Sequence, residues 1–192
     1  MVPKILVFAG SIRTGSFNAR LAARAVKELL EAGAEVTWIS LVDFSLPLYD
    51  GDLEADSGQP ENALKLKRLM MMHQGVFIVT PEYNASIPPL LKNALDWISR
   101  VRERNEPPLA AYRDRVFALG AASDRPSGGI YALLALRQML EIGAGALVIP
   151  EQFSLARASE AFDEMDDLKD ERAKALLQRV VQRLIETAQE QV

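Results

Sequence analysis

Residues 4–18 read KILVFAGSIRTGSFN, an apolar run that passes directly into a loop of glycines, hydroxyl residues and one arginine. The apolar part, Ile5–Ala9, has the continuous hydrophobicity of a strand buried on both faces of a parallel sheet. Apolar residues at helical spacing follow the loop: Phe17, Leu21, Ala25 and Leu29. The stretch therefore predicts a strand, a polar turn and a helix, the opening half of a parallel β-α-β unit.

Similar apolar runs recur along the chain at Val36–Ser40, Val76–Thr80, Val116–Ala121 and Ala146–Ile149. Segments with helical spacing separate them, one of which carries a stripe of Tyr131, Leu134 and Ala135. This alternation predicts a three-layer α/β/α sandwich around a five-stranded parallel sheet. Five strands favour the flavodoxin-like order 2-1-3-4-5. A chain of 192 residues is expected to form one domain, residues 1–192.

The composition narrows the classes of chemistry that this chain can perform. It holds no cysteine and one histidine, which excludes thiolate catalysis, iron–sulfur clusters and histidine-rich metal sites, so we expect no metal. The net charge of −4, spread without a large block of one sign, argues against nucleic acid. Because no apolar run reaches the roughly 20 residues of a membrane span, we expect no span and a cytoplasmic protein.

The loop Gly10–Asn18 has the composition of an anion cradle. Backbone N–H groups at the start of a helix point outward and carry partial positive charge. Ser11, Ser16 and Asn18 add side-chain donors, and the planar fork of Arg13 can neutralise a phosphate. The alternative is an ordinary loop in which Ser16 only caps the following helix.

Two other phosphate-binding motifs fail at single positions of this loop. A Walker loop needs a lysine where Ser16 stands after Gly15. A Rossmann dinucleotide turn needs a glycine where Ile12 stands. The loop therefore predicts a phosphate site of a different kind.

Two more loops of unusual composition follow the third and fourth predicted strands. The first reads PEYNASIPP over residues 81–89, and its prolines restrict the backbone around an exposed tyrosine and asparagine. Such a loop can hold a planar, hydrogen-bonding ring, or it can be a stiff turn with Tyr83 packed on the surface. The second reads ASDRPSGG over residues 122–129, where paired glycines permit either a close ligand or a tight helix entry.

The pattern Gly10-Ser11-x-Arg13-x-x-Ser16-x-Asn18, together with Pro81-Glu82-Tyr83-Asn84, resembles the NADPH-dependent FMN reductase family. That family includes flavodoxin-like quinone, chromate and azo-dye reductases. The stretch PPLLKNALDW at residues 88–97 is similar to the helix that follows the second motif in the family. The resemblance extends over nearly the whole chain.

The resemblance implies a cofactor, flavin mononucleotide (FMN), with NADPH or NADH as cosubstrate. It implies that the FMN phosphate and ribityl chain contact Ser11, Arg13, Ser16, Phe17 and Asn18. It further implies that the isoalloxazine ring is lined, largely through backbone groups, by Pro81, Glu82, Tyr83 and Asn84, with Ser123 near the ring's other polar edge. One departure stands out, because Asp124 and Arg125 replace the proline and glycine that the family often carries in its third loop.

The activity that the resemblance implies is transfer of a hydride from NAD(P)H through FMN to quinone-like, azo, metal-oxyanion or flavin acceptors. Flavin chemistry needs orientation and hydrogen bonds more than catalytic side chains, so we assign no catalytic residue. Two alternatives stay open: a flavodoxin-like electron carrier and a redox-sensing flavin module without turnover. Electron carriers usually hold phosphate without a loop arginine, so Arg13 and the mild net charge argue against the carrier.

Three expectations concern residues outside these loops. The resemblance implies a homodimer or homotetramer, and the helix Leu90–Arg102 with Trp97 is a candidate for burial between subunits, the monomer core being the alternative. His73 is expected to end a helix as a surface or C-terminal charge partner. The segment Leu41–Gln59, which holds Pro47, is expected to be a surface loop.

Overall fold

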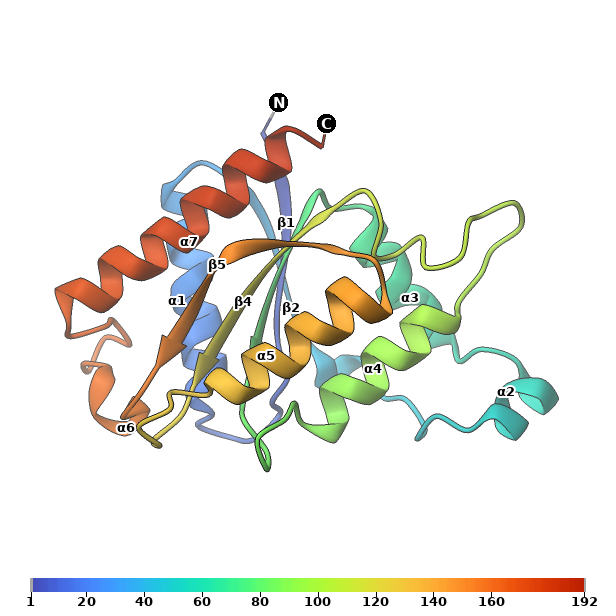
Figure 1. The fold of residues 1–192 in the computed structure, drawn as a ribbon, viewed down its shortest axis with the longest axis horizontal. Helices are drawn as coiled ribbons and strands as arrows, with labels where there is room; N and C mark the ends of the chain where they lie inside the picture. The colour runs from blue at the N-terminus through green and yellow to red at the C-terminus, as the bar shows by residue number, and fades with distance from the viewer. Residues whose placement is uncertain (1, 192) are drawn as a thin grey trace.

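The computed structural model describes residues 2–191 and shows one parallel sheet between two layers of helices (Figure 1). Its strands are β1 (Lys4–Ala9), β2 (Glu35–Ser40), β3 (Gly75–Thr80), β4 (Val116–Ala122) and β5 (Leu147–Leu155). They lie in the order β2-β1-β3-β4-β5, and all neighbouring pairs are parallel. The predicted sandwich and its strand order are confirmed.

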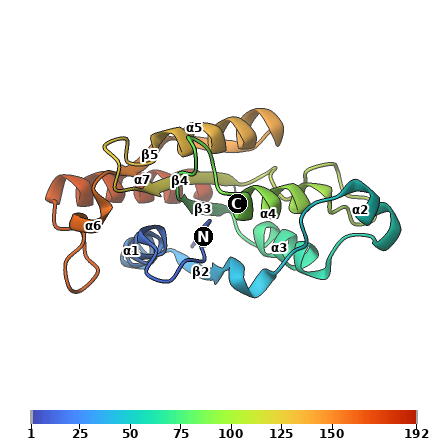
Figure 2. The same ribbon diagram turned by 90° about the horizontal axis from the view of Figure 1, so that it is seen from below.

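The helices are α1 (Phe17–Glu31), α2 (Gly51–Ser57), α3 (Glu61–Met71), α4 (Pro89–Arg100), α5 (Ile130–Gln138), α6 (Ala158–Ala161) and α7 (Glu171–Gln189), with the 3-10 turn η1 (Leu41–Phe44) and the π-helical turn η2 (Met139–Gly143). Figure 2 shows α1 and α7 on one face of the sheet and α3, α4 and α5 on the other. Within the described part of the chain, none of these helices has the length and apolar character needed to cross a bilayer.

The two faces of the sheet bury alternate residues of each strand. Ile5 and Val7 of β1 belong to the core under α1 and α7, whereas Leu6 and Phe8 belong to the core under α3, α4 and α5. Every residue of β3 and β4 is buried. This two-sided burial explains why those strands read as unbroken apolar runs.

Strand β5 is longer than the predicted run Ala146–Ile149 and continues to Leu155. The pairing with β4 changes register between Phe117 and Leu119, so that Leu119 pairs with Gln152. Pro150 lies in this irregular part, which an edge strand tolerates because one side has no ladder partner. The residues directly after Pro150 are polar, so the sequence pattern did not predict the rest of the strand.

The apolar stripe predicted for α5 lies on the wrong face. Tyr131 and Leu134 are 52% and 53% exposed, whereas Ala132, Leu133 and Leu136 are fully buried. The segment is apolar on all sides, so spacing alone does not select the face that meets the core.

The segment Leu41–Gln59 is not a plain surface loop, because it contains η1 and α2 and is anchored to α4. The carbonyl of Pro47 accepts hydrogen bonds from Trp97 Nε1 at 2.8 Å and from Asn93 Nδ2 at 2.9 Å. Trp97 has no exposed surface in the monomer. Burial of Trp97 between subunits is therefore wrong, and its place in the monomer core is confirmed.

His73 is buried just after α3 and does not act as a surface charge partner. Its Nδ1 lies 2.6 Å from the Leu69 carbonyl and its Nε2 lies 2.7 Å from the Thr37 hydroxyl. Because a carbonyl only accepts, Nδ1–H donates to Leu69 and neutral Nε2 accepts from Thr37. Burial lowers the pKa of His73, partly opposed by the bond to the Leu69 carbonyl.

This burial predicts a pH dependence of stability in the mildly acidic range. Unfolded histidine titrates near pKa about 6.5, above the folded value, so the unfolded chain binds more protons between the two. The free energy of unfolding should fall as pH drops below about 6.5, by at most about 1.4 kcal/mol per pH unit. Urea unfolding at several pH values between 5 and 7.5 measures this slope.

His73→Gln is the informative variant because it removes the only histidine of the chain. The comparison uses the slope of the unfolding free energy against pH, so a loss of stability that is the same at every pH does not affect it. The variant should lose most of the slope above the range in which carboxylates titrate. An unchanged slope would show that His73 is not its source.

Candidate functional site

The strand order brings three loops to one edge of the sheet. Ala9 pairs with Val79, and Thr80 pairs with Ala121, so β1, β3 and β4 end side by side. The loops that follow them, residues 10–16, 81–88 and 123–129, lie along the lower edge of the sheet in Figure 1. Ligands of open α/β sheets bind outside the carboxyl ends of strands, near the point where strand order reverses.

The first loop turns tightly and leaves a row of donors without protein partners. Gly10 N donates to Val79 O at 2.7 Å, and Ser16 N donates to Arg13 O at 3.1 Å. Within residues 2–191, the backbone N–H groups from Ser11 to Gly15 donate to no protein acceptor. Successive free N–H groups before a helix form a concave anion site, so the loop fits a phosphate group.

Glycine is favoured at both ends of this donor row. A Cβ on Gly10 would lie 3.0 Å from the Leu91 side chain, and Gly15 has φ +68° in the left-handed region. Ser16 then caps α1, its Oγ accepting from Ala19 N at 3.4 Å. The prediction that Ser16 caps α1 is correct. The cap does not use the free N–H groups of residues 11–15, so both features are present in the loop.

Arg13 is exposed beside this donor row. Its guanidinium makes long contacts to the carbonyls of its own loop, 3.5 Å to Thr14 and 3.3 Å to Gly15, and lies 5.7 Å from the centre of the Phe17 ring. Among the described residues it has no carboxylate partner. The positive charge is therefore available to an anion at the loop.

Asn18 is buried and ties α1 to the end of β4. Its Nδ2 donates to Ala122 O at 2.9 Å, and its Oδ1 accepts from Ala122 N at 2.8 Å. Both polar groups of the amide are thus committed within the protein. Asn18 contributes to the site by fixing the first loop against the third.

The second loop forms a two-residue reverse turn. Tyr83 and Ser86 exchange both backbone hydrogen bonds, N to O at 2.9 and 3.0 Å. Between them Asn84 and Ala85 have φ of 51° and 59°, the left-handed pair that defines a type I′ turn. Asparagine tolerates this conformation but alanine does not favour it, so the turn holds local strain of the kind found at ligand sites.

Tyr83 and Glu82 of the second loop differ in what their side chains contact. The Tyr83 side chain is 51% exposed, whereas Glu82 Oε2 accepts from Tyr131 N at 3.1 Å in the first turn of α5. The carboxylate therefore complements the positive end of α5. One hydrogen bond joins the loop after β3 to the helix after β4.

The third loop is fixed to the segment that follows β5. Ser123 N donates to Leu155 O at 2.9 Å, and Ala158 N donates to Ser123 O at 3.2 Å. Asp124 Oδ1 accepts from Ser159 N at 2.7 Å, and Ser123 Oγ accepts from Arg125 N at 3.2 Å. The departure at Asp124 thus has a structural use, since its carboxylate holds α6 against the loop.

The ten residues singled out in the sequence all lie at this edge, but their side chains differ in availability. Those exposed or partly exposed are Ser11, Arg13, Phe17, Pro81, Glu82, Tyr83, Asn84 and Ser123. Ser16 and Asn18 are buried, 3% and 4% exposed. The links from Asn18 to Ala122 and from Glu82 to Tyr131 could not be predicted, because no local pattern pairs residues so distant in the chain.

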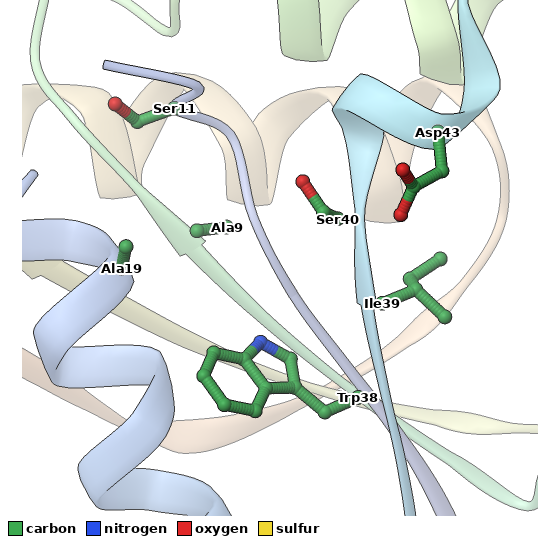
Figure 3. Close-up of a pocket in the computed structure, with 7 residues that line it drawn as sticks. All are labelled: Ala9, Ser11, Ala19, Trp38, Ile39, Ser40 and Asp43. Atoms are coloured by element: carbon green, nitrogen blue, oxygen red, sulfur yellow. The ribbon is translucent and has the colours of Figure 1, made fainter. Parts of the chain in front are cut away.

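A cleft of about 310 Å³ adjoins the first loop on the side of β2. Figure 3 shows its lining, with the Trp38 indole lying between β2 and α1 and the Asp43 carboxylate near Ser40. The sequence offered no signal for this cleft. Asp43 would repel a phosphate in this cleft, whereas the row of free N–H groups from Ser11 to Gly15 would attract one.

Comparisons with known proteins agree with this geometry. Residues 3–160 match the family described as NADPH-dependent FMN reductase. The chain is 37% identical over 138 residues to a quinone reductase of Escherichia coli, covering 71% of this chain and 69% of the relative. It is 33% identical over 183 residues to an NAD(P)H-dependent FMN reductase of Pseudomonas aeruginosa, covering 94% and 92%.

A solved structure gives the same result for the fold. The flavoenzyme NAD(P)H:(acceptor) oxidoreductase FerB of Paracoccus denitrificans superposes with a TM-score of 0.80 at 28% identity, covering 99% of both chains.

Proposed function

The chain belongs to the NADPH-dependent FMN reductase family, and we propose that it passes electrons from its flavin to quinone-like acceptors. It is an NAD(P)H-driven, FMN-dependent oxidoreductase, as are relatives named quinone reductase and NAD(P)H-dependent FMN reductase. The quinone acceptor is favoured by the first of these relatives. A flavodoxin-like carrier or a sensor without turnover is not favoured.

The single observation that supports the placement of FMN is the row of free N–H groups from Ser11 to Gly15. We propose that they hold the FMN phosphate together with Ser11 Oγ and the Arg13 guanidinium. Ser16 and Asn18 fix the backbone of this loop through their bonds to Ala19 and Ala122, and Phe17 is proposed to lie next to the ribityl chain. When bound, FMN supplies two-electron transfer between the nucleotide and the acceptor.

The second and third loops are proposed to receive the isoalloxazine ring. The backbone bonds between Tyr83 and Ser86 close the type I′ turn, so the N–H groups of Asn84 and Ala85, free among the described residues, are held in one orientation, beside the exposed Tyr83 side chain. This arrangement suits the hydrogen-bonding edge of a planar ring. Pro81 and Glu82 lead into that turn, and Ser123 lies across from it on the third loop. No side chain is required as a general acid, since these residues orient the reactants.

We also propose that residues 1–192 act as one FMN-binding domain in the cytoplasm. The two buried clusters share the strands of the one sheet, which supports a single unit. The use of NAD(P)H as electron donor supports a place in the cytoplasm.

Turnover of the purified, FMN-loaded protein tests the proposed function. Its absorbance should show oxidised flavin that bleaches when NADPH or NADH is added without acceptor. Addition of a benzoquinone should restore the oxidised spectrum and sustain nucleotide oxidation without any partner protein. If the flavin is reduced but the quinone does not reoxidise it, the quinone assignment is wrong.

Arg13→Ala should weaken FMN binding by about tenfold to a hundredfold, as expected for the loss of a charged hydrogen bond to phosphate. Titration of the apoprotein with FMN, followed by quenching of flavin fluorescence, measures the dissociation constant. Riboflavin, which lacks the phosphate, should bind wild type and variant equally. Arg172→Ala, an exposed arginine of α7, is the control and should bind FMN normally.

We propose a homo-oligomer assembled through the exposed apolar face of α5 and η2. Tyr131, Leu134 and Ile142 are 52%, 53% and 81% exposed, and Leu147 at the start of β5 is 48% exposed. Large apolar side chains exposed along one helix are typical of a contact between subunits. A second copy of the chain seated on α5 would also border the ring loop, because Tyr131 N bonds to Glu82.

The double variant Leu134→Glu and Ile142→Glu should dissociate the oligomer by placing charges in this contact. Light scattering at micromolar concentration should give a multiple of 21.2 kDa for wild type and 21.2 kDa for the variant. Met165→Glu is the control, since Met165 is 87% exposed but lies before α7. A wild-type protein that is monomeric and fully active would contradict the assembly.

A further inference from the structure

We propose that Arg125 binds a phosphate group of the nicotinamide nucleotide and so helps to select this cosubstrate. The proposal rests on the proposed function and extends it to a residue at which this chain departs from the third-loop pattern of its family. It concerns the incoming nucleotide and leaves the phosphate of FMN to the first loop.

The backbone around Arg125 is held on both sides. Its N–H donates to Ser123 Oγ at 3.2 Å, and its carbonyl accepts from Gly128 N at 3.0 Å. Pro126 restricts the next residue. Ser123 is itself bonded to Leu155 and Ala158 on the neighbouring segment. The Arg125 side chain therefore starts from a fixed point, which lowers the entropy cost of binding.

The Arg125 side chain has no function within the fold. It is exposed, and in residues 2–191 its guanidinium neither donates a hydrogen bond nor forms an ion pair. The adjacent carboxylate of Asp124 is engaged by Ser159 N at 2.7 Å instead. Among the described residues other exposed arginines, such as Arg113 and Arg179, also lack an acid partner, but Arg125 lies in the loop after β4, at the edge of the sheet where ligands bind. A preorganised loop with an uncommitted guanidinium is suited to a planar, bidentate phosphate contact.

The position of Arg125 favours the nucleotide over FMN. Arg125 lies three residues beyond Ala122, the residue held by Asn18 next to the first loop. Strand β4 is also the neighbour of β3, whose loop carries Tyr83. Hydride transfer requires the nicotinamide to lie against the ring, so its phosphates fall at the rim of these loops. The FMN phosphate already has the free donors of the first loop and Arg13.

Net charge gives a further reason for a cation at this rim. The chain carries −4, and the nucleotide is itself an anion, so their overall interaction is repulsive. Acids at the same edge include Asp43, Glu82 and Asp124. A guanidinium beside the ring offsets this repulsion where the phosphates arrive. The phosphate can belong to the pyrophosphate common to both nucleotides or to the 2′-phosphate of NADPH.

Isothermal calorimetry of the FMN-loaded protein with NAD⁺ and NADP⁺ tests the proposal without turnover. Arg125→Ala should weaken binding by about tenfold or more, as for a lost charged hydrogen bond. Equal weakening of both nucleotides identifies the pyrophosphate, and weakening of NADP⁺ alone identifies the 2′-phosphate. Arg125→Lys should recover part of the affinity, because the charge remains but the fork is lost.

Arg179→Ala removes the same charge from an exposed position of α7 and should change neither affinity. In steady-state assays Arg125→Ala should raise KM for the affected nucleotide and leave kcat at saturation unchanged. Unchanged nucleotide binding in Arg125→Ala overturns the proposal, as does a loss confined to FMN affinity. Failure of the wild-type protein to oxidise NAD(P)H would instead overturn the proposed function, so the two failures are distinguishable.

Discussion

The site depends on one buried amide, that of Asn18, which satisfies both the N–H and the carbonyl of Ala122. Ala122 ends β4, and Asn18 lies in the first turn of α1, directly after the polar loop. An unpaired backbone group buried there would cost about 1–3 kcal/mol, so the contact fixes where β4 stops pairing and where the first loop lies. The donor row and the third loop therefore keep a constant separation, as a cofactor spanning them requires.

The architecture was predictable because its signal is local. The three inner strands β1, β3 and β4 are buried on both faces, and so each appears as an unbroken apolar run between helical segments. The end of β5 escaped prediction because Pro150 and a register shift interrupt the pattern at an edge strand. The exposed face of α5 was not predicted because apolar residues surround the whole helix. Only the neighbouring elements decide which side is covered.

The loops of the site were also predictable, since clusters of glycine, hydroxyl and proline residues stand out after apolar strands. What each side chain does there was not. Asn18 was expected to contact a ligand, and nothing in the sequence indicated that its amide also bonds to the backbone of Ala122, a residue more than a hundred positions away. The left-handed pair Asn84 and Ala85 carried no signal at alanine, because sequence preference disfavours the conformation that the turn imposes.

The hydrogen bond from Tyr131 N to Glu82 has a consequence for how flavin content relates to assembly. It joins the proposed ring loop to the helix on which a second copy is proposed to sit. Thermodynamic linkage is reciprocal, so any factor by which FMN strengthens self-association is the factor by which self-association strengthens FMN retention. A dilute solution of such a protein would then release its cofactor as its subunits part, and a concentrated one would keep both.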